Sequence, residues 1–243
     1  MSDVAARDIA RYNPVGMSID FYWGSGSPPC WRVALALEHK GLAYNSHLLH
    51  FDRQEHKSPQ MLAMNFRCRL PVLRDNDYVV FESLAILYYL DKKYPDPPIF
   101  GRNAEEAGVI MRVICEYQSY AEPPVKQIFD ALSQPNERKI DEVTTESMHR
   151  VAGEARTIEQ RLARSDWVVG ETFSAADMMI YPDIRLLLRM LQRPKAHELA
   201  ARFLPLEVNY PAIGRWLDRV AALPGHERTW PPHWPPLATA NPR

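Results

Sequence analysis

A serine at the start of a helix is the feature of this sequence best placed to do chemistry. Ser27 precedes Pro28 and Pro29, and a helical pattern follows from Cys30. Serine is a preferred N-cap residue, and proline is favoured in the first turn because its missing N–H would have no partner there. The positive end of a helix binds anions, so the Ser27 hydroxyl could donate a hydrogen bond to an anion such as a thiolate. On this local pattern alone, an ordinary N-cap is the commoner interpretation.

Cys30 offers a second chemistry. The spacing Ser27-x-x-Cys30 is that of a glutaredoxin pair in which the first, attacking cysteine has become serine. Cys30 lies one turn into the expected helix, where a buried and unreactive thiol is the expected state. The pattern therefore favours chemistry at a hydroxyl over chemistry at a protein thiol.

An alternating series of strands and helices must position this serine. We expect strands at residues 19–23, 44–49, 71–73 and 78–81, and helices at 30–40, from 58, and at 83–94. Gly41 ends the first helix, and residues 75–77 form the turn of a hairpin. The order βαβαββα predicts an α/β domain over residues 17–97.

Beyond residue 103 only helical periodicity remains, which predicts an all-helical domain over residues 104–230. Helices are expected at residues 104–120, 137–163 and 212–223, and one more begins at Ser174. Ser174 and Asp177 have the spacing of a capping box, so Asp177 should serve folding and cost about 0.5 to 2 kcal/mol when replaced by alanine. Residues 1–16 and 231–243 are expected to be tails.

Composition excludes several classes of function. The formal net charge of -1 lacks the basic excess that nucleic-acid binding requires. The longest apolar run, residues 84–90, is far shorter than the ~20 residues of a membrane span. Three cysteines without C-x-x-C spacing argue against a disulfide framework and a zinc site. With no signal peptide in residues 1–16, we expect a cytoplasmic protein without a metal, nucleic-acid or membrane partner.

Four motifs together carry a resemblance to a known family. They are YWGSGSPPCWRV at residues 22–33, EHKSP at residues 55–59, Leu70-Pro71 and Glu82-Ser83. Over residues 17–225 the chain resembles the cytosolic glutathione transferases, most closely the rho class, and the second motif is also similar to the phi class. The resemblance implies a thioredoxin-like first domain that holds glutathione and an all-helical second domain that shapes the site of the electrophile.

The resemblance also implies where the two ends of glutathione bind. The Ser83 hydroxyl and the N–H groups of its helix would take the γ-glutamyl carboxylate, and Glu82 would take the α-ammonium group. His56 and Lys57 would meet the glycine carboxylate through charge-assisted hydrogen bonds. Arg69 stands where relatives usually have glutamine, and its guanidinium can also bind a carboxylate.

The middle of glutathione would lie between these ends. Leu70-Pro71 matches the family's cis-proline, whose preceding backbone pairs with the cysteinyl residue. Three hydroxyls could activate the sulfur: Ser27 ranks first, Tyr22 second, since other transferase classes carry a catalytic tyrosine near there, and Ser25 third.

The electrophile would meet the sulfur from the second domain. The resemblance implies that the helix at residues 104–120 faces the thiol and presents Met111, Cys115, Tyr117 and Tyr120. Residues at helical spacing can equally belong to the core.

The resemblance implies a glutathione transferase that conjugates glutathione to apolar electrophiles. Ser27 and the helix end would lower the pKa of the glutathione thiol from about 8.5. A decrease of ~2 in this pKa corresponds to about 2.7 kcal/mol of preferential thiolate binding. Two alternatives are a glutathione-dependent thiol oxidoreductase or lyase, and a non-catalytic ligand-binding module. A homodimer is expected, because a second subunit would bury exposed apolar side chains such as Phe51.

Overall fold

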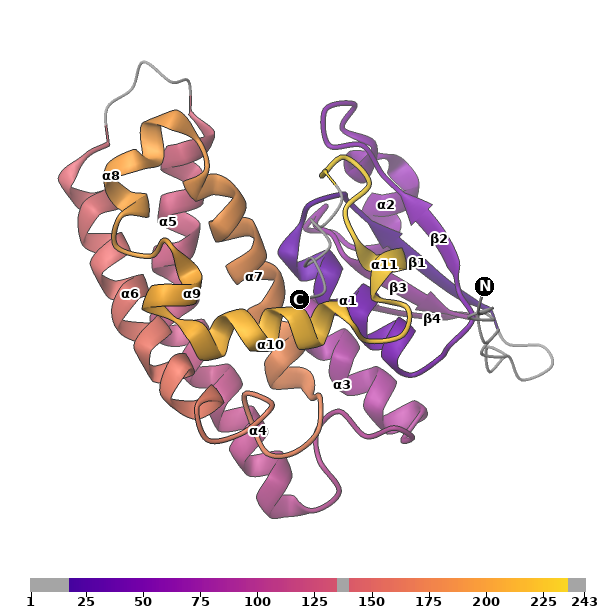
Figure 1. Ribbon diagram of the computed structural model, residues 1–243. Helices are drawn as coiled ribbons and strands as arrows, with labels where there is room; N and C mark the ends of the chain where they lie inside the picture. Colours follow the sequence, from indigo (N-terminus) through magenta and orange to yellow (C-terminus); the bar gives the residue numbers. More distant parts are fainter. Residues whose placement is uncertain (1–17, 135–139, 236–243) are drawn as a thin grey trace, which may run out of the picture. The chain divides into compact units, whose positions relative to one another are not determined.

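Two units divide the chain in the computed structural model, which describes residues 18–134 and 140–235 (Figure 1). Unit 1 contains the described residues up to Pro97 together with the segment from Glu227, and unit 2 contains Pro98–His226. The expected tail at residues 1–16 lies outside the described residues, as do residues 236–243. The described part of the expected C-terminal tail is instead grouped with unit 1, as is the end of the expected second domain.

Unit 1 is built on a four-stranded mixed sheet in the order β2-β1-β3-β4. Strand β1 is parallel to β2 and antiparallel to β3, and β3 and β4 form the expected hairpin. Asp75 is paired with Tyr78, so the turn is shorter than expected and consists of Asn76 and Asp77. The elements are β1 (Ile19–Trp23), α1 (Pro28–His39), β2 (Asn45–Leu48), η1 (Glu55–Lys57), α2 (Pro59–Met64), β3 (Val72–Asp75), β4 (Tyr78–Phe81) and α3 (Ser83–Lys93). The predicted order βαβαββα and the thioredoxin-like domain are confirmed.

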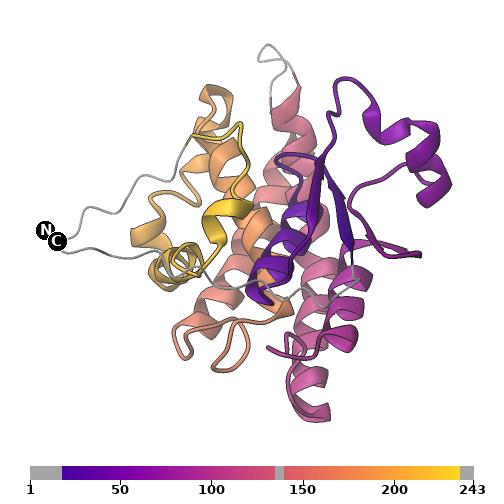
Figure 2. The same cartoon turned by 90° about the vertical axis from the view of Figure 1, so that its right-hand side faces the viewer.

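Helices cover both faces of this sheet, as the nearly edge-on view in Figure 2 shows. α1 and α3 pack against each other through side chains such as Leu37, Ile86 and Leu90, which are fully buried. On the other face, Met61 of α2 packs against Tyr22 and Val72. Alternate residues of β1 therefore belong to different layers of unit 1.

Unit 2 is all-helical, as expected. Its long helices lie side by side: α5 packs against α6 and α7, and α4 packs against α7 (Figure 2). Nearly every residue of the first three turns of α7 is buried, so this helix forms the centre of the unit. The elements are α4 (Ala104–Glu116), η2 (Tyr117–Ala121), α5 (Glu122–Ser133), α6 (Glu142–Leu162), α7 (Ala175–Leu191), η3 (Pro194–Ala196), α8 (His197–Ala200), α9 (Leu206–Asn209) and α10 (Pro211–Ala221), and α11 (His226–Thr229) begins at the boundary.

The helix expected at residues 104–120 is interrupted. α4 ends at Glu116, and a π-helical turn, η2, leads directly into α5. Pro123 and Pro124 lie in the first turn of α5, where their missing N–H groups cost nothing. The two prolines therefore begin α5, a helix that the expected elements did not include.

The capping box at the start of α7 is confirmed. The Ser174 N–H donates to Asp177 Oδ2 at 3.0 Å, and the Ser174 side chain accepts hydrogen bonds from the first turn. Asp177 is fully buried and also accepts from the Val168 N–H at 2.9 Å and from Trp216 Nε1 at 2.8 Å. One carboxylate thus joins three separate parts of unit 2.

The C-terminal segment (residues 227–235) packs against α1 within unit 1 (Figure 1). The rings of Trp31, Trp230 and Trp234 meet edge to face, with centroids 5.4 to 5.6 Å apart. Trp31 Nε1 donates to Thr229 Oγ1 at 2.8 Å. Aromatic contacts and hydrogen bonds therefore fix this segment, whose residues were expected to lie at the end of the all-helical domain and in a tail.

Candidate active site

The turn between β1 and α1 places Ser27 as predicted. Ser27 is the N-cap of α1, with extended backbone angles (φ -82°, ψ 116°), and Pro28 and Pro29 follow it. Its side chain makes no capping hydrogen bond within the described part of the chain. Because the prolines remove two N–H donors from the first turn, an anion at this helix end depends on the Ser27 hydroxyl more than it would at an ordinary N-terminus.

Cys30 is an inert thiol. It is 1% exposed, and its sulfur accepts a hydrogen bond from the Gly24 N–H at 3.4 Å. Burial raises the pKa of Cys30 to about 11, against hydrogen bonds from Ser27 and Gly24 that lower it. The thiol therefore stays neutral near pH 7, and the Ser27 hydroxyl rests against it.

Tyr22 lies on the face of β1 opposite Phe21 and Trp23. Phe21 and Trp23 face α1 and line a cavity of about 30 Å³ together with Ser27 and Cys30. Tyr22 points the other way, is 5% exposed in the cluster with Met61 and Val72, and stacks on His47 at 4.5 Å between centroids. The second-ranked hydroxyl therefore belongs to the core of unit 1.

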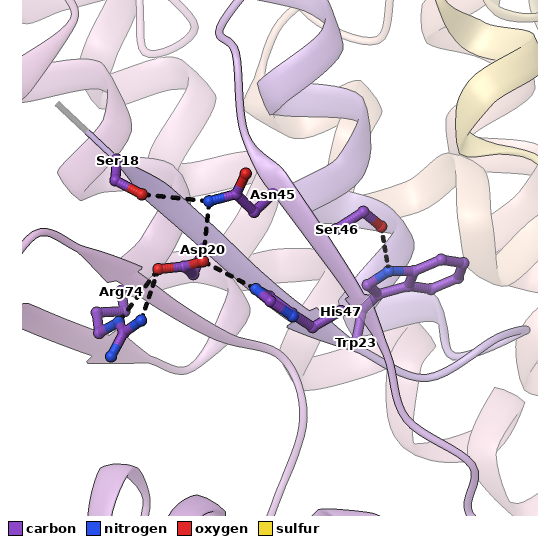
Figure 3. Close-up of polar contacts among 7 residues, drawn as sticks. All are labelled: Ser18, Asp20, Trp23, Asn45, Ser46, His47 and Arg74. Carbon is purple, nitrogen blue, oxygen red and sulfur yellow. Dashed lines mark hydrogen bonds and ion pairs between the residues drawn. The ribbon is translucent and has the colours of Figure 1, made fainter.

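A polar network that sequence analysis missed lies on this same face (Figure 3). Asp20 Oδ1 is 2.8 Å from His47 Nε2, and Asp20 Oδ2 accepts from Arg74 Nη2 at 2.8 Å. Burial raises the pKa of Asp20, but hydrogen bonds from His47, Arg74 and Asn45 outweigh it, so the pKa is lowered. The network joins β1, β2 and β3, and its signal in the sequence is an acidic residue inside an otherwise apolar strand.

The structure brings His56, Lys57 and Arg69 together as a cationic group. His56 Nδ1 is buried without a hydrogen-bond partner among the described residues. Burial lowers the pKa of His56, and the charges of Lys57 and Arg69 lower it further. Three neighbouring cationic or polar donors are suited to an anionic ligand group such as a carboxylate.

Phe51 links this cationic group to the turn at Ser27. Its ring meets the His56 ring edge on, with centroids 5.2 Å apart. The other side of the ring fills the space beside Gly24, where a Cβ atom would lie 2.2 Å from Phe51 Cε2. A side chain at position 24 would therefore displace the Phe51 ring from its place beside the start of α1.

Asn65 holds the loop that contains Arg69. Asn65 is 2% exposed, donates from Nδ2 to the Arg69 carbonyl at 2.9 Å, and accepts from the Arg67 N–H at 3.0 Å. The Leu70–Pro71 peptide bond that follows is cis, and β3 begins immediately after it. The cis bond is the one that the resemblance implies.

Glu82 and Ser83 form a second helix N-terminus in unit 1. Glu82 is exposed and has a φ of 70°, an unfavourable conformation for a residue with a Cβ, of the kind that collects at functional sites. Ser83 is the first residue of α3 and is 8% exposed. This helix end has no side-chain cap from Glu82 and is suited to a carboxylate.

The four residues expected to meet the electrophile divide into two groups within unit 2. Tyr117 is 5% exposed and donates to Asp183 Oδ2 at 2.9 Å, so it belongs to the core and not to an open site. Cys115 and Tyr120 are exposed, and Met111 is half-buried. Among the expected residues, those three remain available to a ligand.

Two features are absent from the described residues, 18–134 and 140–235. No helix in that part of the chain is long and apolar enough to cross a membrane. No group of three or more histidine, cysteine, aspartate or glutamate side chains there is arranged to hold a metal ion.

A thioredoxin-like unit followed by an all-helical unit defines a class of two-domain proteins. The glutathione S-transferase N-terminal domain matches residues 22–98, and the glutathione S-transferase C-terminal domain matches residues 115–224. Glutathione S-transferase A from Pleuronectes platessa is 31% identical over 223 residues, which cover 87% of this chain and 91% of that protein. The chain belongs to the glutathione S-transferase family, and it is an enzyme that uses glutathione as co-substrate.

The chain is also similar to further proteins in sequence and in structure. Maleylacetoacetate isomerase from Pseudomonas aeruginosa is 28% identical over 231 residues, covering 92% of this chain and all of that protein. The crystal structure of a glutathione S-transferase from the Antarctic clam Laternula elliptica superposes with a TM-score of 0.76 at 30% identity, covering 89% of this chain and 94% of that one.

Proposed function

We propose that the enzyme holds the thiolate of glutathione at the N-terminus of α1 and transfers it to an apolar electrophile. The observation that carries this proposal is the Ser27 hydroxyl, which makes no capping bond within the described residues and contacts the neutral thiol of Cys30. A hydrogen bond to an anion is roughly twice as strong as one between neutral groups. When glutathione binds, the Ser27 hydroxyl would exchange its contact with the neutral Cys30 thiol for a stronger hydrogen bond to the glutathione thiolate. This exchange therefore favours the ionised form of glutathione.

The remaining contacts would hold the two ends of the tripeptide. The α3 N-terminus with Ser83 and Glu82 suits the γ-glutamyl group, and the cationic group at His56, Lys57 and Arg69 suits the glycine carboxylate. Cys30 does not support a thiol oxidoreductase, because a fully buried thiol with a raised pKa is a poor nucleophile. The direct test is the absorbance titration of the thiolate of bound glutathione, which should show a thiol pKa below its free value of about 8.5. An unshifted pKa would overturn the proposal.

Ser83→Ala should weaken glutathione binding by about 1 to 3 kcal/mol, because a charge-assisted hydrogen bond to the γ-glutamyl carboxylate is lost. The affinity for S-methylglutathione should decrease in parallel, since the lost hydrogen bond does not involve the sulfur. Isothermal calorimetry measures both ligands.

Ser46→Ala is the matched control, because Ser46 lies in β2 at the opposite edge of the sheet and its hydroxyl accepts from Trp23 Nε1. Unchanged affinity of Ser83→Ala for both ligands would place the γ-glutamyl site elsewhere.

We also propose that two copies of the chain form a homodimer. Unit 1 leaves large aromatic side chains exposed, among them Phe51 (46%), Phe66 (67%), Tyr78 (55%) and Tyr88 (50%). Exposed apolar surface of this kind is commonly covered in an assembly. Light scattering at micromolar concentration should report about twice the chain mass of 28.0 kDa, and a value near the single mass would contradict the dimer.

A cytoplasmic location is part of the same proposal. Cys30, Cys68 and Cys115 are free thiols, as is usual for proteins of a reducing compartment.

A further inference from the structure

The third hydroxyl of the β1–α1 turn has a partner from the far end of the chain. Ser25 Oγ lies 2.6 Å from His233 Nδ1, and both residues belong to unit 1. Trp234 Nε1 in turn donates to His233 Nε2 at 3.1 Å. The imidazole sits directly over Gly26, where a Cβ atom would lie 2.8 Å from His233 Cε1.

These two hydrogen bonds fix the direction of the Ser25 hydroxyl. An indole N–H can only donate, so Nε2 of His233 is the accepting nitrogen. A neutral His233 then carries its proton on Nδ1 and donates it to Ser25 Oγ. Because Ser25 accepts from the imidazole, its own O–H hydrogen is directed to a different acceptor.

That hydroxyl faces an open pocket of about 500 Å³. Its walls are mostly apolar, formed by Leu48, Leu49, Phe51 and Pro232, and the exposed His50 and Asp52 complete the lining. The volume is in the range of about 300 to 1,000 Å³ that is usual for small-molecule sites. Ser25 and His233 provide a hydrogen-bond donor in this apolar pocket, and such a donor selects a ligand with an acceptor atom.

We propose that this pocket binds an apolar electrophile that carries a carbonyl oxygen conjugated to the reacting carbon, and that Ser25 donates to that oxygen while His233 positions Ser25. The proposal rests on the proposed function, which places the glutathione thiolate at Ser27. Residues two apart in sequence are separated by at most about 7 Å between Cα atoms. This separation is short enough for the proposal to place the sulfur at Ser27 and the donor at Ser25 at the two ends of one conjugated enone.

The addition of glutathione to the enone requires no reagent other than water. The thiolate forms a bond to the β-carbon of the enone, and the C=C π electrons move to give an enolate whose oxygen receives the Ser25 hydrogen bond. The enolate pair then takes a proton from water at the α-carbon, which restores the carbonyl group and leaves hydroxide in solvent. Stabilisation of the developing oxyanion by a fixed hydrogen-bond donor contributes much of the rate enhancement in such steps.

Two substrates separate this role from thiol activation. The enone 4-phenylbut-3-en-2-one has the oxygen acceptor, and benzyl chloride has none. Ser25→Ala should lower kcat/KM for the enone roughly 10- to 100-fold, as expected for one oxyanion donor, and leave benzyl chloride within about twofold of the parent.

Substitutions of His233 test the positioning role. His233→Asn keeps an N–H near the position of Nδ1 and should retain most of the kcat/KM for the enone. His233→Phe has no such donor, so its kcat/KM for the enone should fall as much as that of Ser25→Ala. The double variant Ser25→Ala with His233→Phe should lose no more than either single variant, because both remove the same hydrogen bond.

Each other outcome has a defined meaning. Equal losses on both substrates in Ser25→Ala would overturn the inference and assign Ser25 to the thiol. A parent enzyme without enone activity, or a full enone rate in His233→Phe, would also overturn it. A parent without benzyl chloride activity and with an unshifted thiol pKa would instead contradict the proposed function.

Discussion

Ser27→Ala is expected to lower the rate of conjugation by roughly 10- to 1000-fold while glutathione binding persists, because one hydrogen bond to the thiolate is lost. The other contacts proposed for glutathione, at the N-terminus of α3 and at His56 and Lys57, are expected to be unaffected by the substitution. The pH dependence of kcat/KM with benzyl chloride should show the thiol pKa returning toward about 8.5.

Tyr22→Phe is the matched control, since Tyr22 lies in the core on the opposite face of β1. It should keep both the rate and the lowered thiol pKa. A full rate in Ser27→Ala together with loss in Tyr22→Phe would transfer the role to the tyrosine. Ser27→Cys should also lose conjugation, but it should gain transfer from glutathionylated disulfides, because a cysteine at a helix N-terminus has a lowered pKa.

Asp177→Ala is expected to lower the free energy of unfolding by about 3 to 5 kcal/mol, more than the roughly 0.5 to 2 kcal/mol that the capping box alone predicts. The substitution leaves the Val168 N–H and the Trp216 indole buried without an acceptor, and each such group costs about 1 to 3 kcal/mol. The capping bond to Ser174 is lost as well. Urea unfolding followed by circular dichroism measures the change, and Glu171→Ala, at an exposed carboxylate, is the control. A native midpoint in Asp177→Ala would contradict the structural role.

The same carboxylate should give stability a defined pH dependence. Burial raises the pKa of Asp177 to about 6 from 3.8, against hydrogen bonds from Val168, Trp216 and Ser174 that lower it. The folded state therefore binds this proton more tightly than the unfolded state, and the contribution of Asp177 to stability decreases as the pH rises from about 4 to about 6. The difference in unfolding free energy between the parent and Asp177→Asn should change across this window and be constant above it.

Local chemistry explains what the sequence could predict. The N-cap at Ser27, the capping box at Ser174 and Asp177, and the order of strands and helices up to residue 97 all depend on residues within a few positions of one another. The period of two in a strand also places Asp20 and Tyr22 on one face of β1, away from Phe21 and Trp23. That pattern was available in the sequence and would have lowered the rank of Tyr22.

Contacts distant in sequence explain what could not be predicted. Ser25 and His233 are separated by 208 positions, and Asp177 and Trp216 by 39. Nothing near Ser25 distinguishes it from an ordinary turn residue, and the sequence does not show that Trp230 and Trp234 pack on Trp31. The interruption at Tyr117 was also missed, because the π-helical turn spans only five residues and the chain is α-helical on both sides of it.

The return of the C-terminal segment to unit 1 affects how the chain folds during synthesis. Unit 1 is discontinuous in sequence, and all of residues 98–226 are translated between its two parts. At about 5 to 20 residues per second, a ribosome needs roughly 6 to 26 s for that stretch. During this interval the nascent first unit exposes Trp31 without its two tryptophan neighbours, and Ser25 has not yet met His233. The turn at the start of α1 therefore reaches its final structure only after the second unit has left the ribosome.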